Sequence, residues 1–327
     1  MSFFKRKGRR GRGMRIFFAT DIHGSEQCFR KFLNARVAYE ADVLILGGDV
    51  TGKGMVPIVE CAGGWSAVVR GVTETASTAE ELAELQRKIR MMGLYDLVVS
   101  PDEKRAMDED PRVLQARFEE AMRGSLLRWT TLAAERLPDG YPAFMMLGND
   151  DYSSFENVLR RAEAITYAED GIYDLPLDYQ LLSLGYSNPT PWDTPRELTE
   201  EQIEHTLEER FTKVADPRRV VFNVHVPPYD TKLDRAPLLD EQLRPVVGAD
   251  GGVQLGPVGS TGARTVIERH QPAVGLHGHI HECAAGDSIG TTLCVNPGSE
   301  YLIGTLRGAL VELDQDGTVA RWQLTQG

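Results

Sequence analysis

Five short apolar runs along the chain predict buried β-strands. Each run is almost continuously hydrophobic over four to six residues, which is typical of strands covered on both faces. We expect them to form the centre of the fold. The runs cover residues 14–19, 42–46, 143–147, 220–224 and 273–276.

Helical periodicity occupies much of the sequence between these runs. The predicted helices cover 25–39, 79–92, 112–137 and 199–214. The helix over 199–214 opens with a capping-box pattern, in which Gln202 follows Thr199 by three residues. The buried face predicted for the first helix carries Phe29, Phe32, Leu33 and Val37.

The end of the chain has a different pattern. It contains three further predicted strands, at 291–295, 309–313 and 318–324. The turn residues 314–317 join the last two strands, which are therefore expected to pair as a hairpin. The sequence thus predicts an α/β fold that includes some antiparallel strands.

No internal repeat or linker divides residues 14–327, which we expect to form one domain with a helical insertion at about 76–137. Residues 1–13 are rich in Lys, Arg and Gly, and they lack the apolar surface needed to order themselves. They are expected to be a disordered basic arm. An arm that touches phosphates or an anionic membrane surface is the alternative.

The composition restricts the functional classes. Hydrophobic residues make up 42% of the chain and charged residues 26%, so a disordered or fibrous protein is excluded. The formal charge of −12 argues against coating of nucleic acid, which is expected only as a substrate. The four cysteines form no C-x-x-C pair, and no apolar run approaches the roughly 20 residues of a membrane span. We expect a cytoplasmic protein with reduced, buried thiols.

Residues suited to metal binding follow each of the five apolar runs. Ligands of open α/β sheets collect at the carboxyl ends of the strands, so these residues are expected to share one crevice. At least four of the seven histidines belong to the set. The expected ligands are Asp21, His23, Asp49, Asn149, His225, His279 and His281, while Asp150 stands next to Asn149 and His277 is expected to be structural.

The residue types predict two divalent metal ions. Imidazole and carboxylate together suit Mn, Fe or Zn better than Mg, and the absence of Cys argues against a closed structural zinc site. The two oxygens of a carboxylate such as Asp49 can bridge two ions. Two ions about 3.5–4 Å apart can clamp a phosphoryl group and generate hydroxide at neutral pH. A phosphate ester is therefore the expected substrate.

The ordered motifs D-x-H, G-D, G-N, a single H and G-H-x-H resemble the calcineurin-like metallophosphoesterases, especially their small prokaryotic members. The resemblance runs from Asp21 to His281. It implies a four-layer α/β/β/α sandwich of two mixed sheets, and hydrolysis of a phosphomonoester or phosphodiester. It implies that Asp49 bridges two metals. The remaining implied ligands are Asp21, His23 and His281 on one metal, and Asn149, His225 and His279 on the other.

One position departs from the family pattern. The residue after Gly-Asn is usually a His that contacts the phosphate or protonates the leaving group, but this chain has Asp150 there. The next residue, Asp151, matches the acidic residue of the pattern. An ionised Asp150 would repel phosphate, whereas a protonated one would serve as a general acid, so Asp150 is a candidate catalytic residue. The alternative function is a weak or inactive scaffold that binds a ligand or a protein.

Two other segments carry recognisable patterns. Residues 47–53 match the G-x-x-x-x-G-K pattern of a P-loop, but Gly54 stands where Ser or Thr should hold Mg²⁺, so a nucleotide site is not expected. Residues 229–260 are rich in Gly, Pro and Asp and begin close to His225. A long loop in this place is expected to line the substrate.

Overall fold

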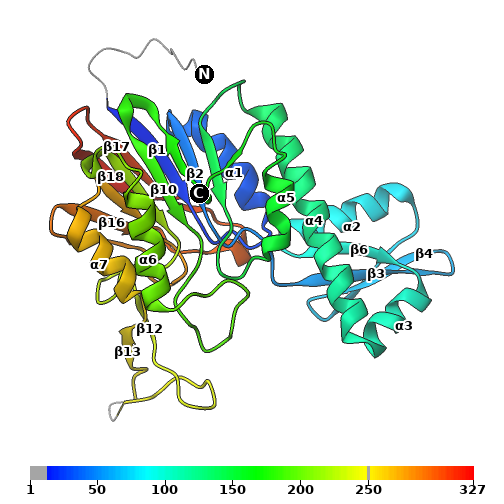
Figure 1. The fold of residues 1–327 in the computed structure, drawn as a ribbon. Coiled ribbons are helices and arrows are strands. Elements are labelled where there is room, and N and C mark those ends of the chain that lie inside the picture. Colours follow the sequence, from blue (N-terminus) through cyan, green and yellow to red (C-terminus); the bar gives the residue numbers. More distant parts are fainter. Residues whose placement is uncertain (1–12, 249–250) are drawn as a thin grey trace.

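Two six-stranded mixed sheets form the centre of the computed structural model, which describes residues 13–248 and 251–327 (Figure 1). The basic arm expected at 1–13 therefore lies, except for its last residue, outside the described residues. The first sheet contains, in spatial order, β18 (Val319–Gln326), β17 (Arg307–Leu313), β1 (Met14–Ala19), β2 (Val43–Gly47), β7 (Ala143–Met146) and β8 (Thr166–Tyr167). The second contains β15 (Ala285–Ile289), β16 (Thr292–Asn296), β14 (Val274–Leu276), β11 (Val220–Val224), β10 (Gln180–Leu184) and β9 (Ile172–Asp174).

Alternate side chains of β1 enter different layers of the molecule, as the two-residue period of a strand requires. Ile16 and Phe18 belong to an apolar cluster built from both sheets. Phe17 and Ala19 belong to a cluster that includes helices α1 (Glu26–Ala38) and α4 (Pro111–Arg136). Helices α6 (Glu200–Phe211) and α7 (Thr261–His270) pack on the outer face of the second sheet. The four-layer α/β/β/α sandwich is confirmed.

The five expected central strands are β1, β2, β7, β11 and β14, and neighbours among them within a sheet are parallel. The expected hairpin is the antiparallel pair β17 and β18. The sequence analysis missed β10, although this strand is central to the second sheet and pairs in parallel with β11.

The predicted helices are present, with one correction to their packing. Thr199 and Gln202 form the expected capping box at the start of α6. In α1 the prediction that Val37 faces the core is wrong, because its side chain is 67% exposed. Val37 lies nine residues after the buried Cys28, which places it half a turn away at about 100° per residue.

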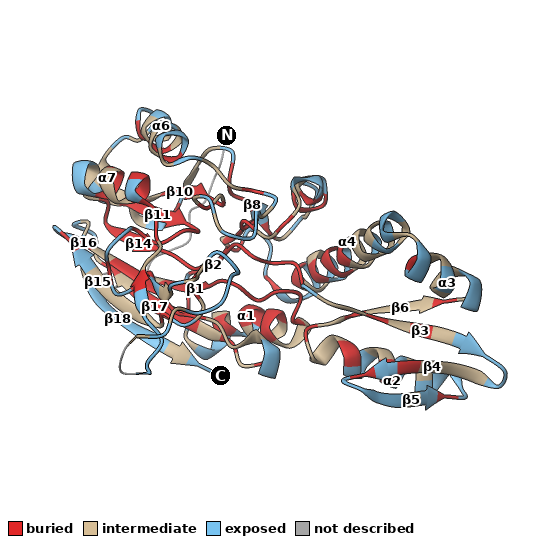
Figure 2. Cartoon of the chain, turned by 90° about the horizontal axis from the view of Figure 1, so that it is seen from below, coloured by how far each residue is buried: buried red, intermediate tan, exposed pale blue. Residues whose placement is uncertain are grey.

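The segment between β2 and β7 projects from the sandwich and is not wholly helical (Figures 1 and 2). It carries α2 (Ala79–Met91) and α3 (Pro101–Glu109) as well as the first part of α4. The sequence did not indicate its sheet, because a strand such as β3 buries only alternate residues, and its apolar run MVPIV contains a proline, which is unfavourable inside a strand. This sheet contains, in spatial order, β5 (Val72–Ala76), β4 (Gly64–Val69), β3 (Met55–Cys61) and β6 (Tyr95–Val99).

Three smaller features complete the description. The Gly-rich stretch at 229–260 contains an antiparallel pair, β12 (Arg235–Pro237) and β13 (Leu255–Pro257), that extends away from the sheets (Figure 1). Within the described ranges, no helix is both long and apolar enough to span a membrane. The cysteines are free, and three are buried, but Cys61 is exposed, contrary to expectation.

Candidate metal centre

All seven predicted metal ligands lie at the carboxyl ends of the central strands. His225 directly follows β11, and Asp49 lies two residues beyond β2. Six of the seven, all except Asn149, supply the ligand atoms of two groups that could each hold one ion. The first group contains Asp21, His23, Asp49 and His281, and the second contains Asp49, His225 and His279.

The spacing of the ligand atoms suits a shared ion in the first group. His23 Nε2 lies 3.1 Å from His281 Nε2 and 3.7 Å from Asp49 Oδ2. His281 Nε2 lies 3.4 Å from Asp21 Oδ1. Atoms that each bind zinc at about 2 Å in a tetrahedron are separated by about 3.3 Å, so these four side chains fit one ion.

The second group adjoins the first through Asp49. His225 Nε2 is 3.4 Å from Asp49 Oδ1, and it is buried without a hydrogen-bond partner. His279 Nδ1 is 2.8 Å from Asn149 Oδ1, which brings the predicted amide ligand to the same place. An imidazole nitrogen held beside two buried carboxylates is an arrangement that a metal ion would satisfy. The donor set therefore fits two ions that share the carboxylate of Asp49.

Backbone carbonyls orient two of the buried imidazoles. His225 Nδ1 lies 2.9 Å from Gly47 O, a contact that leaves its Nε2 facing the carboxylates. A hydrogen bond of this kind fixes the tautomer of a metal-binding histidine. His277 Nδ1 lies 2.8 Å from Val224 O, but His277 belongs to neither ligand group, in keeping with a structural role.

The backbone at four of the predicted ligands is strained. Asp21, His23, Asp49 and His279 adopt left-handed conformations with φ between 36° and 66°. Such conformations cost roughly 1–3 kcal/mol each for residues other than glycine, and they concentrate at functional sites. The loops also approach one another closely, because a Cβ atom on Gly148 would lie 2.0 Å from Asp49 Oδ1. Only glycine fits there.

Asp151 ties together the loops that follow β2 and β7. Its carboxylate accepts hydrogen bonds from the backbone N–H groups of Val50 at 3.0 Å, Thr51 at 2.8 Å and Gly148 at 2.7 Å. Burial raises the pKa of Asp151 to about 6, and the neighbouring charge of Asp49 adds to the shift. The acidic residue after Asp150 is thus a loop anchor that does not belong to the ligand groups.

Two residues that the sequence analysis missed hold the Asn149 segment in place. Thr194 Oγ1 accepts a hydrogen bond from Asn149 Nδ2 at 3.0 Å, which directs the amide oxygen of Asn149 toward His279. Arg196 is buried and donates from its guanidinium to Gly148 O at 3.0 Å. Both lie in the loop between β10 and α6, about 45 residues from Asn149, and no local motif identifies them.

Asp150 is paired with a lysine at the edge of the centre. The Lys53 ammonium forms an ion pair with the Asp150 carboxylate. The Asp150 backbone N–H donates to Asp49 Oδ1 at 3.0 Å. Tyr301, in the short 3₁₀ helix η4 (Tyr301–Ile303), lies beside the first group, and its ring is tilted against that of His23 with the centroids 4.7 Å apart.

Burial and neighbouring charges shift the pKa values of the histidines in opposite directions. Burial opposes a positive charge on His225, but Asp49 and Asp21 outweigh burial and raise its pKa to about 10. Burial lowers the pKa of His279 to about 4. Burial likewise lowers the pKa of His23 to about 3, against the pull of Asp49 and with the help of the Lys53 charge. His23 and His279 are therefore neutral at pH 7, as metal ligands must be.

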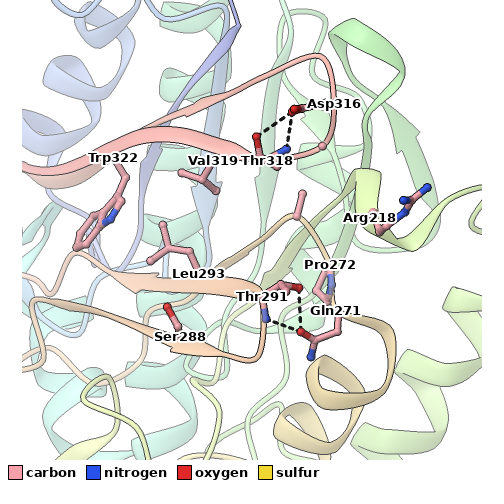
Figure 3. A pocket seen from close by; sticks show the side chains of 12 residues that line it. Arg218, Gln271, Pro272, Ser288, Thr291, Leu293, Asp316, Thr318, Val319 and Trp322 are labelled. Carbon is pink, nitrogen blue, oxygen red and sulfur yellow. Dashed lines mark hydrogen bonds between the residues drawn. The ribbon is translucent and has the colours of Figure 1, made fainter.

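A cavity of about 510 Å³ lies elsewhere, between the β17–β18 turn and strands of the second sheet (Figure 3). Its wall includes Pro272 and Ala273, which precede β14, whereas His279 and His281 of the centre follow this strand. Two polar side chains in its wall are already paired, since Gln271 Oε1 accepts from Thr291 and Asp316 Oδ1 accepts from Thr318. This cavity contains none of the predicted ligands.

Comparison with known proteins adds evidence on the fold. No family model matches the chain. An uncharacterized protein of Methanocaldococcus jannaschii is 32% identical over 136 residues, which are 41% of this chain and 55% of that protein. The alignment thus spans about half the length of the curated relative.

Two solved structures match nearly the whole chain. One aligns with 96% of this chain and 99% of its own length at 15% identity, with a TM-score of 0.57. The other, a Thermus thermophilus protein, aligns with 96% of this chain and 98% of its own length at 13% identity, with a TM-score of 0.53. Both likenesses support the sandwich fold that the resemblance to the calcineurin-like metallophosphoesterases implies, and the motifs D-x-H, G-D, G-N, H and G-H-x-H follow strands of its two facing mixed sheets.

Proposed function

We propose that this protein hydrolyses phosphomonoesters or phosphodiesters with the help of two divalent ions of the Mn, Fe or Zn type. One observation carries the proposal: two groups of side chains that could each hold a metal ion, most of them buried, share the carboxylate of Asp49. Imidazole and carboxylate ligands in this combination suit these metals. Within each group the ligand atoms lie within 4.8 Å of one another, so each group can surround a single ion.

The side chains of the centre have separate tasks in this proposal. When bound, two such ions supply positive charge for the phosphoryl group and lower the pKa of water. Asp49 joins the two groups, while the carbonyl of Gly47 keeps Nε2 of His225 available as a ligand. Thr194 turns the amide oxygen of Asn149 inward. A preorganised set of donors of this kind needs little rearrangement when substrate arrives.

The contact between Asp150 and Lys53 supports an enzyme over the scaffold alternative. That alternative rested on a carboxylate, Asp150, in a place where negative charge would repel phosphate. The ion pair with Lys53 offsets that charge. Burial and the charge of Asp49 raise the pKa of Asp150, and the contact with Lys53 partly opposes them. Because the ion pair occupies its carboxylate, we assign Asp150 the task of holding Lys53 in place.

Metal content and turnover measured on the same samples test the proposal. Protein reconstituted with Mn²⁺ or Zn²⁺ should contain close to two ions per chain and should hydrolyse p-nitrophenyl phosphate or bis-p-nitrophenyl phosphate. Asp49→Ala should lose more than one ion, because both ligand groups contain this carboxylate. Asp316→Ala, at the distant cavity, is the matched control and should keep both ions. A wild-type protein that binds no metal would contradict the proposal, and two bound ions without turnover would favour the scaffold.

A further inference from the structure

Lys53 is held beside the metal centre by Asp150. It follows Asp49 by four residues in the loop between β2 and β3, and its ammonium pairs with the Asp150 carboxylate. Asp150 is itself attached to the centre, because its backbone N–H donates to Asp49 Oδ1 at 3.0 Å. The ion pair therefore keeps a positive charge next to the carboxylate that the two ligand groups share.

The Lys53 ammonium has donors that Asp150 does not use. The Lys53 side chain is 51% exposed, compared with 19% for Asp150. A lysine ammonium carries three N–H donors, and across the described part of the chain Asp150 is its only ion-pair partner. A ligand that enters from solvent can therefore contact Lys53 without breaking the pair.

An ordinary surface ion pair is the simplest alternative explanation. The pair of Lys88 with Glu74, in the projecting segment, is of this kind, with side-chain exposures of 46% and 25%. Such pairs contribute little to stability. The pair of Lys53 with Asp150 has similar exposure but a different place, since it adjoins the centre through Asp49. Its position, not its strength, points to a task in binding substrate.

We propose that Lys53 binds the phosphate group of the substrate and selects phosphomonoesters over phosphodiesters, with Asp150 as the residue that positions it. The inference rests on the proposed phosphoesterase function. A phosphomonoester carries about 1.5–2 negative charges at neutral pH and has three terminal oxygens. A phosphodiester carries one charge and replaces one terminal oxygen with an ester oxygen, which is a poorer acceptor. A fixed ammonium therefore favours the monoester.

Substitution of Lys53 tests this selectivity with two nitrophenyl esters. Lys53→Gln should lower kcat/KM for p-nitrophenyl phosphate by about 10–100-fold, the loss expected for a charged hydrogen bond, and for bis-p-nitrophenyl phosphate by less than about threefold. Lys53→Arg keeps the charge and should retain most of the activity on the monoester. Lys88→Gln is the matched control, and it should leave both activities unchanged. The metal content should be the same in all these variants.

Inorganic phosphate provides a readout that does not depend on turnover. Calorimetric titration of metal-loaded protein should show phosphate binding that Lys53→Gln weakens by a similar factor and Lys88→Gln does not change. Asp150→Asn should raise KM for the monoester more than it lowers kcat, because the ammonium is no longer held in place.

Equal losses on both esters in Lys53→Gln would overturn the inference. Unchanged phosphate affinity in that variant, or a wild-type protein that binds no phosphate, would overturn it as well. Absence of turnover on both esters in wild-type protein contradicts the proposed function instead. In that case the phosphate titration still decides whether Lys53 binds the anion.

Discussion

Replacement of Arg196 by Met should destabilise the protein by about 3–5 kcal/mol, the usual effect of removing one partner of a buried ion pair. The Arg196 side chain is 1% exposed and pairs with Glu169, which is 5% exposed. Its guanidinium also donates to Gly148 O at 3.0 Å and lies 4.3 Å from the ring centroid of Tyr186. The substitution leaves the carboxylate of Glu169 buried without its cation, which is the larger part of the expected effect.

Urea unfolding measures this change in the free energy of unfolding. The midpoint should fall while the slope stays constant, because the surface exposed on unfolding hardly changes. The double variant Arg196→Met with Glu169→Leu removes both charges. Its loss in the free energy of unfolding should be smaller than the sum of the two single losses, and the difference should be about 0.5–3 kcal/mol. Arg160→Met is the control. Arg160 also pairs with a carboxylate, Asp170, and lies 4.8 Å from a tyrosine ring, but it is 41% exposed, so about 0–1 kcal/mol is expected.

The same variant should also affect the metal centre. The backbone N–H of Arg196 donates to Asn149 O at 3.2 Å, and its side chain holds the carbonyl of Gly148. We therefore expect metal binding at the group with His225 and His279 to weaken by about 10–100-fold, the range seen when supporting residues are lost. Equal destabilisation by Arg196→Met and Arg160→Met, or strict additivity in the double variant, would refute the reasoning.

Two further predictions concern the same group of ligands. Thr194→Val should weaken binding of one of the two ions by about tenfold or more, because the amide of Asn149 loses the contact that orients it. Metal titration of this variant checks the prediction, with Thr190→Val as the control. Metal binding near pH 8 should release about one proton from His225, whose pKa of about 10 keeps it protonated there in metal-free protein. The apparent affinity should therefore rise with pH up to about 10, and titrations in buffers of different ionisation enthalpy measure the proton count. A proton count unaffected by His225→Asn would contradict this assignment.

The metal ligands could be predicted from the sequence because each follows a recognisable strand. His225 comes directly after five consecutive buried residues, and Asp49 comes two residues after another such strand. Parallel strands bring their carboxyl ends to one edge, so a local pattern and a general rule suffice to group the residues. Their roles as ligands remain a proposal, but their convergence needed no knowledge of long-range contacts.

The residues that support the ligands could not be predicted in this way. Thr194 and Arg196 lie in a loop without hydrophobic periodicity, and their contacts with Asn149 and Gly148 span 45 and 48 residues. In the sequence, Lys53 stands out only as part of a P-loop pattern. In the structure it instead pairs with Asp150, which lies 97 positions further along the chain (150 minus 53). A hydrogen bond between two loops leaves no periodic trace in either segment, so only the folded chain reveals it.

The strained ligand backbones and the supporting contacts have a common explanation. Left-handed conformations at Asp21 and His279 are unfavourable by roughly 1–3 kcal/mol each, so other interactions must hold them. The N–H of His279 donates to Asp21 Oδ2 at 3.1 Å, and Ser299 Oγ donates to Asp21 O at 2.6 Å. Both contacts are made between protein groups, and the first joins the loop that follows β1 to the loop that follows β14. Folding of the sandwich therefore brings the proposed ligands together, and we expect metal binding to displace protons from them.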